Sequence, residues 1–179
     1  MKNVNKRGNK TKTITICAML SALGVVVLYL GSFIDVLDAS MAVIASVMSI
    51  VAVIEFGHGA SWSIYAVTSV LSLILLPNKS AAVMYAAFFG FYPILKEVFE
   101  KRRKVVSWIL KEITFNAALV VCFVIIRFLI LSDIAEIPTM MYVFGAVLLE
   151  AVFVLYDLAL TRLISLYIFK LRNRLRIGK

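Results

Sequence analysis

Long apolar runs separated by short polar connections make up most of the chain and predict membrane-spanning helices. We expect helices at 14–34, 41–56, 60–77, 80–95, 105–131 and 138–169. The second and fourth of these runs are shorter than the about 20 residues that a helix needs to cross the hydrocarbon core, so each is also compatible with a re-entrant segment. The polar remainder is a basic arm at 1–13 and a basic tail at 170–179.

The positions of the positive charges decide between these alternatives. Seventeen of the nineteen Lys and Arg residues fall in three clusters, at 2–12, 96–111 and 162–179. Cytoplasmic flanks of membrane helices are enriched in Lys and Arg, so clusters separated by long apolar stretches indicate an even number of crossings between them. The sequence therefore predicts an all-α bundle of six transmembrane helices, in a single membrane domain, with both termini in the cytoplasm.

Composition agrees with a membrane protein. The 179 residues are 63% hydrophobic and 16% charged, whereas soluble domains are about 45 to 50% apolar and roughly 25% charged. The net charge of +9 flanks apolar helices, which favours anionic lipids over nucleic acid as the partner. Cys17 and Cys122 lie inside apolar runs without a CxxC spacing, so we expect neither a disulfide nor a metal site.

Three short connections, at 35–40, 77–79 and 132–138, fall on the outer side in this topology. Their acidic residues are Asp35, Asp38, Asp133 and Glu136. Pro77 and Asn78 predict a tight turn, because Pro fixes φ and Asn tolerates turn geometry. We therefore expect the third and fourth helices to form a hairpin.

Catalytic motifs are missing from the sequence. There is no G-x-S-x-G, no H-E-x-x-H and no P-loop, so the motifs of a serine hydrolase, a zinc protease and an ATPase are all absent. The single histidine, His58, follows Gly57 in a short connection that is typical of a solvated turn. We predict no catalytic residue, no metal and no cofactor, and a role in transport or as a scaffold.

Small residues line one face of the first helix. Ala18, Ser21 and Ala22 lie at helical spacing in its first half, and Ala18-x-x-x-Ala22 is the small-xxx-small pattern that allows membrane helices to approach closely. One interpretation is packing against another helix of this chain. The other is a docking face for a separate membrane subunit, in the cytoplasmic half of the helix.

Hydroxyl side chains recur in the third helix. They are Ser61, Ser63, Thr68, Ser69 and Ser72. Hydroxyls bond easily to a carbonyl one turn earlier, so helix packing explains them. The alternative is a polar wall of a ligand pocket in the outer half, for which Ser72 and Asp38 are the candidate residues.

Charged residues also fall well inside the apolar runs, at a cost of roughly 2.5 to 3.5 kcal/mol each. They are Glu112, Arg127, Glu150, Asp157 and Arg162. Glu112 and Arg162 come to similar depths in the cytoplasmic half, and we predict that they form an ion pair. We expect Asp157 to reach Lys111 or Asn116.

Arg127 and Glu150 lie in the outer half and are the best candidates for contact with a ligand from outside. A structural ion pair between the fifth and sixth helices is the competing interpretation, since buried pairs also occur for packing reasons. The sequence alone leaves both open.

These features together resemble the substrate-capture (S) components of energy-coupling factor transporters, which are small bacterial six-helix proteins with both ends in the cytoplasm. The resemblance lies in the basic arm followed by Ile16-Cys-Ala-Met-Leu-Ser-Ala-Leu-Gly24, and in Leu37-Asp-Ala-Ser-Met-Ala-Val-Ile44 leading to Glu55-Phe-Gly57. It extends to size and span pattern over nearly the whole chain. The Gly-Pro that often follows the Phe in the family is replaced here by Gly57-His58-Gly59.

The resemblance implies a location in the bacterial inner membrane and a vitamin-like or nucleobase-like substrate. It also implies that Ala18 and Ala22 dock on a shared membrane T component, and that partner ATPase subunits supply the energy. The alternative is a non-transporting six-helix scaffold of the bacterial cell envelope. An enclosed outer cavity would favour capture, and a fully packed outer half would favour the scaffold.

Overall fold

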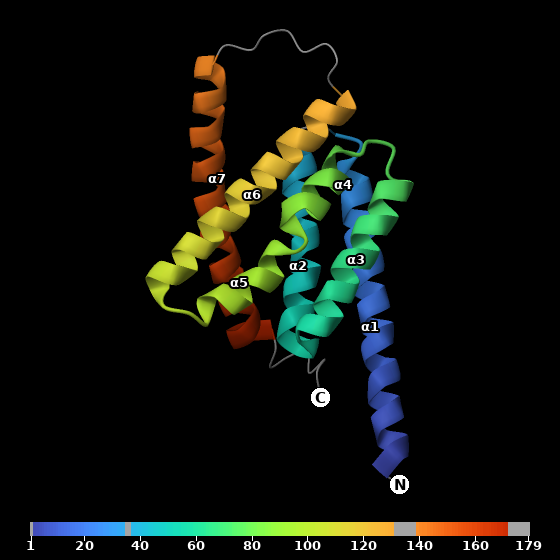
Figure 1. Cartoon of the computed structure of the whole chain (residues 1–179). Coiled ribbons are helices and arrows are strands. Elements are labelled where there is room, and N and C mark those ends of the chain that lie inside the picture. Colours follow the sequence, from blue (N-terminus) through green and yellow to red (C-terminus); the bar gives the residue numbers. More distant parts are fainter. Residues whose placement is uncertain (1, 35–36, 131–138, 172–179) are drawn as a thin grey trace. The chain divides into compact units, whose positions relative to one another are not determined.

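The computed structural model describes residues 2–34, 37–130 and 139–171, and these residues form helices joined by short turns (Figure 1). The elements are α1 (Lys2–Gly31), α2 (Asp38–Phe56), α3 (His58–Leu75), α4 (Ser80–Met84), the π-helical turn η2 (Tyr85–Phe89), α5 (Tyr92–Glu100), α6 (Lys104–Ile130), α7 (Thr139–Leu166) and the π-helical segment η3 (Tyr167–Leu171). The all-α prediction is confirmed for the described part of the chain.

Six helical segments are long and apolar enough to cross a membrane. They are Thr11–Gly31, Asp38–Phe56, His58–Leu75, Ser80–Glu100, Lys104–Cys122 and Phe144–Lys170. The two runs that are short in the sequence reach 19 and 21 residues because polar residues extend the helices beyond the apolar stretch. The chain thus has the helices of a multi-pass membrane protein.

Several expected helix boundaries differ from the structure, such as the third helix, which was expected at 60–77 and is α3 (His58–Leu75). Helix α1 begins at Lys2, so the basic arm is largely helical, and Asp38 belongs to the first turn of α2 rather than to a connection. The fourth span is not one continuous helix, because it consists of α4, η2 and α5 with a turn before Tyr92. The expected connection at 132–138 lies outside the described residues.

The described helices fall into two compact units, residues 1–113 and residues 114–177, with α6 running from the first into the second. The expectation of a single membrane domain stays a prediction. In the first unit, α1, α2 and α3 lie side by side (Figure 1). Its core contains Leu28, Ala42, Ala45, Leu76, Ala81, Ala82 and Tyr85.

Small side chains bring these helices close together. A Cβ added at Gly24 would lie 3.2 Å from Thr68 Cγ2, and one at Gly31 would lie 2.7 Å from Met41 Cβ. Membrane helices lack a hydrophobic force between them and gain stability from such close backbone contact. Gly24 and Gly31 of α1 therefore serve packing on α3 and α2.

Gly57 and Asn78 shape two of the connections in the first unit. Gly57, between α2 and α3, has φ +80°, a conformation that suits glycine, and donates its N–H to the Val53 carbonyl at 3.1 Å. The tight turn predicted at Pro77 and Asn78 is present between α3 and α4. There Asn78 Oδ1 accepts the N–H of Ser80 at 3.0 Å.

The second unit contains the later part of α6 together with α7 and η3. The rings of Phe115 and Phe153 stack with centroids 4.4 Å apart and planes at 10°. Both side chains are buried. This stacked pair connects α6 to α7 within the unit.

Candidate functional site

The small residues of α1 divide between two faces. Ser21 is buried, and its carbonyl accepts a hydrogen bond from Thr68 Oγ1 of α3 at 3.5 Å. Ala18 and Ala22 are exposed. Packing inside the chain therefore uses Ser21, while the Ala18-x-x-x-Ala22 pair lies at the surface next to it.

The hydroxyls of α3 mostly serve packing. Ser61, Thr68, Ser69 and Ser72 are buried, and Ser63 is exposed. Ser72 Oγ donates to the Ser69 carbonyl at 3.1 Å, and Ser61 Oγ donates to the Gly57 carbonyl at 3.2 Å. The ligand candidate Ser72 thus lies within the first unit with its hydroxyl bonded to its own helix.

Asp38, the second ligand candidate in this unit, connects two helix N-termini. Its side chain is buried, and Oδ2 accepts a hydrogen bond from Ser80 Oγ at the start of α4. Lys79 Nζ, next to Ser80, donates to the carbonyls of Ile74 and Leu76 at the end of α3. These contacts bring the ends of three helices together, which favours a structural role for Asp38.

Glu150 lies in the second unit and is held by Asn116. The Asn116 Nδ2 donates to Glu150 Oε1 at 2.9 Å, which connects α6 to α7. Glu150 Oε2 is buried and accepts no hydrogen bond from the residues that the structure describes. An acceptor without a donor in an apolar span is costly. Glu150 Oε2 is therefore a buried acceptor with free hydrogen-bonding capacity. The side chain of Arg127 lies outside the described residues.

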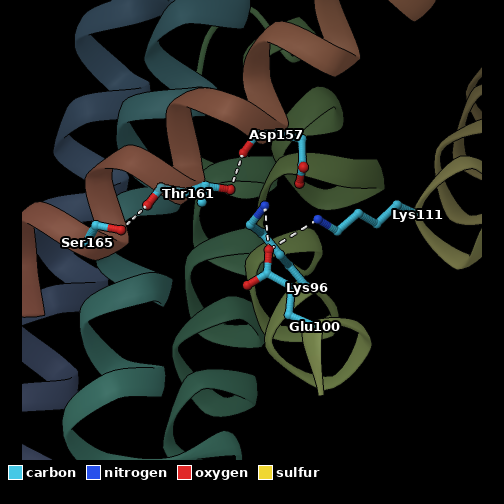
Figure 2. Close-up of polar contacts among 6 residues, drawn as sticks. All are labelled: Lys96, Glu100, Lys111, Asp157, Thr161 and Ser165. Atoms are coloured by element: carbon cyan, nitrogen blue, oxygen red, sulfur yellow. Dashed lines mark hydrogen bonds and ion pairs between the residues drawn. The ribbon is translucent and has the colours of Figure 1, made fainter. Parts of the chain in front are cut away.

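The predicted ion pair of Glu112 with Arg162 joins the two units and stays a prediction, as does a contact of Asp157 with Lys111. Within α7, Asp157 is buried, and its carbonyl accepts a hydrogen bond from Thr161 Oγ1 at 2.9 Å (Figure 2). Asn116, the other partner expected for Asp157, donates to Glu150.

A cluster of charged residues around Glu100 was not predicted from the sequence. Lys96 Nζ and Lys111 Nζ lie 3.0 Å and 3.1 Å from the same oxygen, Glu100 Oε1 (Figure 2). Lys96 is fully buried and Lys111 nearly so. A basic cluster next to a membrane helix normally indicates a solvated flank, so burial was not expected. The spacing of Lys96 and Glu100, four residues apart on one helix face, was the available signal.

A second missed contact involves His58. Its Nε2 lies 2.9 Å from Glu97 Oε2 of α5, and Lys101 Nζ lies 2.8 Å from Glu97 Oε1. His58 stays about 40% exposed, as in a solvated turn, but it also joins the start of α3 to α5. His58 and Glu97 are nearly forty residues apart in the sequence, so no local pattern predicted this pair.

The described residues contain no group of three or more His, Cys, Asp or Glu side chains that could hold a metal ion. Comparison with known protein families, with curated proteins and with solved structures finds no match. The exposed alanine pair of α1 and the Asn116–Glu150 pair are the two features of the described residues that bear on function.

Proposed function

We propose that this chain is the membrane-embedded substrate-binding subunit of an ATP-driven importer, similar to the S components of energy-coupling factor transporters. It lies in the bacterial inner membrane with both termini in the cytoplasm and takes up a vitamin-like small molecule. Six spans and three basic clusters support this topology. A membrane T component and ATPase subunits are its expected partners, and anionic lipids contact the basic clusters.

The observation that carries the proposal is the exposure of Ala18 and Ala22 beside the buried Ser21. Helix packing inside the chain explains Ser21 but leaves the alanine pair unused. Small exposed side chains allow another membrane helix to approach the backbone closely. In the proposed topology this pair lies in the cytoplasmic half of α1, where a coupling subunit would bind.

The cargo contact is assigned to Glu150. Its Oε1 is oriented by Asn116, and its buried Oε2 is available to a donor. A ligand with an N–H or O–H group would supply the missing hydrogen bond and recover the cost of the buried acceptor. Ser72 Oγ and Asp38 Oδ2, from the other candidates described, form hydrogen bonds inside the fold.

The docking face can be tested by tryptophan substitution. The tagged chain is purified from its native host, and co-purifying membrane and ATPase subunits are identified by mass spectrometry. Ala18→Trp with Ala22→Trp places two large rings between the helices, so we expect these subunits to be lost.

The matched control is Met19→Trp with Leu23→Trp. These residues have the same spacing, lie at nearly the same depth on the same helix and are exposed. We expect this variant to retain the partners. Retention of the ATPase subunits by the alanine-pair variant would refute the docking face.

A further inference from the structure

The fourth span is broken near its middle. After α4, the π-helical turn η2 is followed by a turn at Gly90 and Phe91, and α5 then begins at Tyr92 with Pro93 in its first turn. Irregular backbone at membrane depth is tolerated only where protein or a cavity surrounds it. π-Helical turns are rare and often mark functional positions.

The break leaves backbone carbonyls without their usual donors. Gly90 donates its N–H to the Tyr85 carbonyl at 2.7 Å, five residues back, so the Ala86 carbonyl loses the donor that an α-helix would provide. Tyr65 of α3 replaces it, because its hydroxyl donates to the Ala86 carbonyl at 2.7 Å. Pro93 has no N–H and cannot serve the Phe89 carbonyl. A side chain of the neighbouring helix α3 thus supplies a hydrogen bond that the break removes.

Aromatic rings enclose the same point. A Cβ at Gly90 would lie 2.6 Å from the Tyr65 ring and 2.7 Å from the Tyr85 ring. The Tyr65 ring also meets the Phe91 ring edge-on, with centroids 6.0 Å apart. Tyr65 therefore contacts the residues before and after the break.

Both halves of the span pack on α2 and α3, but their polar contacts differ. The first half is bound to α2 through the Ser80–Asp38 contact and through the hydroxyls of Tyr85 and Ser49, which lie 3.3 Å apart. The second half, α5, also packs on α2, but its ion pairs lead to α3 and α6. Its Glu97 pairs with His58 at the start of α3, and its Glu100 accepts from Lys111 of α6.

We propose that the Gly90–Phe91 break is a hinge and that Tyr65 is its latch. Helix α5 swings about this break together with the basic 101–104 turn, while α4 and η2 stay fixed on α2. The hydrogen bond from Tyr65 to the Ala86 carbonyl holds the closed position. The hinge follows from contacts inside the first unit and does not depend on the proposed importer function.

Spin-label distances in lipid nanodiscs test the hinge. In a background with Cys17 and Cys122 replaced by Ala, one label pair is placed at Val67 of α3 and Val98 of α5. A second pair joins Val67 to Met84 of α4. All three side chains are at least 38% exposed, which suits labelling.

Tyr65→Phe removes the latch hydroxyl and keeps the ring. Removing a side-chain hydrogen bond of this kind in a membrane bundle shifts a conformational equilibrium constant by roughly threefold to twentyfold. We expect the open population in the Val67–Val98 distances to rise by that factor, with Val67–Met84 unchanged. Tyr29→Phe, which removes an exposed hydroxyl from α1, should change neither pair.

Two results would overturn the proposal. Identical Val67–Val98 distributions with Tyr65 and with Tyr65→Phe would show that the hydroxyl latches nothing. Equal changes in both label pairs would show that Tyr65 supports the packing of the whole unit and that no hinge exists at Gly90.

Discussion

Gly90→Ala tests whether the break in the fourth span is closely packed. Gly90 has φ −74° and ψ −41°, so alanine meets no backbone strain there. The added methyl group would lie 2.6 Å from Tyr65 Cδ2 and 2.7 Å from Tyr85 Cε1. Neither ring moves away easily. Tyr85 is fully buried, and the Tyr65 hydroxyl is bonded to the Ala86 carbonyl.

The expected loss of stability combines two opposing effects. Forcing an extra methyl group into a packed site costs about 1 to 3 kcal/mol. Replacing glycine by alanine in a helical conformation returns about 0.4 to 1 kcal/mol by restricting the unfolded chain. We therefore expect Gly90→Ala to lower the free energy of unfolding by up to about 2.6 kcal/mol.

Reversible unfolding in mixed micelles measures this difference, and Gly145→Ala is the matched control. Gly145 lies within α7, and an added Cβ there would meet no atom within 4 Å. The control should gain about 0.4 to 1 kcal/mol. If Gly90→Ala stabilises the protein as much as Gly145→Ala does, the close packing at the break is wrong.

Two further substitutions, each with a control variant, probe the first unit by the same unfolding measurement. Glu100→Gln replaces the charged acceptor of two buried lysines and should lower the free energy of unfolding by about 1.5 to 3 kcal/mol. The control, Lys101→Met, removes an exposed ion pair and should lower it by less than about 1 kcal/mol. Equal costs would contradict the buried cluster. Gly57→Ala should cost about 1 to 3 kcal/mol from its φ of +80° alone, while Gly59→Ala should be close to neutral. A neutral Gly57→Ala would disprove that turn geometry.

The spans and one turn could be predicted because their signals are local. Apolar runs mark the six helices, and Pro77-Asn78 carries the turn between α3 and α4 in its own residue types. The ends of the helices were less well predicted. Polar residues such as Lys2 and Asp38 extend helices beyond the apolar stretch, and an apolar count does not register them.

The break in the fourth span could not be derived from its own sequence. Gly90 and Pro93 hinted at it, but an apolar count over 80–95 predicts one helix. The hydroxyl that donates to the Ala86 carbonyl at the break belongs to Tyr65, which lies on another helix. The burial of Lys96 depends in the same way on Glu100 and on a third side chain from α6.

For the candidate site residues, position in the sequence was predictable but hydrogen-bond partners were not. The chain pattern placed Glu150 in an apolar span, but the choice of Asn116 as its neighbour depends on how α6 and α7 are rotated. Ser72 was a candidate on composition and turned out to bond to its own helix. Helix rotation is set by packing, which hydropathy alone does not encode.

Native mass spectrometry of the protein released gently from its own membrane tests the central claim most directly. We predict that the wild-type chain carries one retained small molecule, and that Glu150→Gln lowers its occupancy while Lys101→Met does not. Wild-type protein without any bound small molecule would contradict substrate capture and would favour the scaffold.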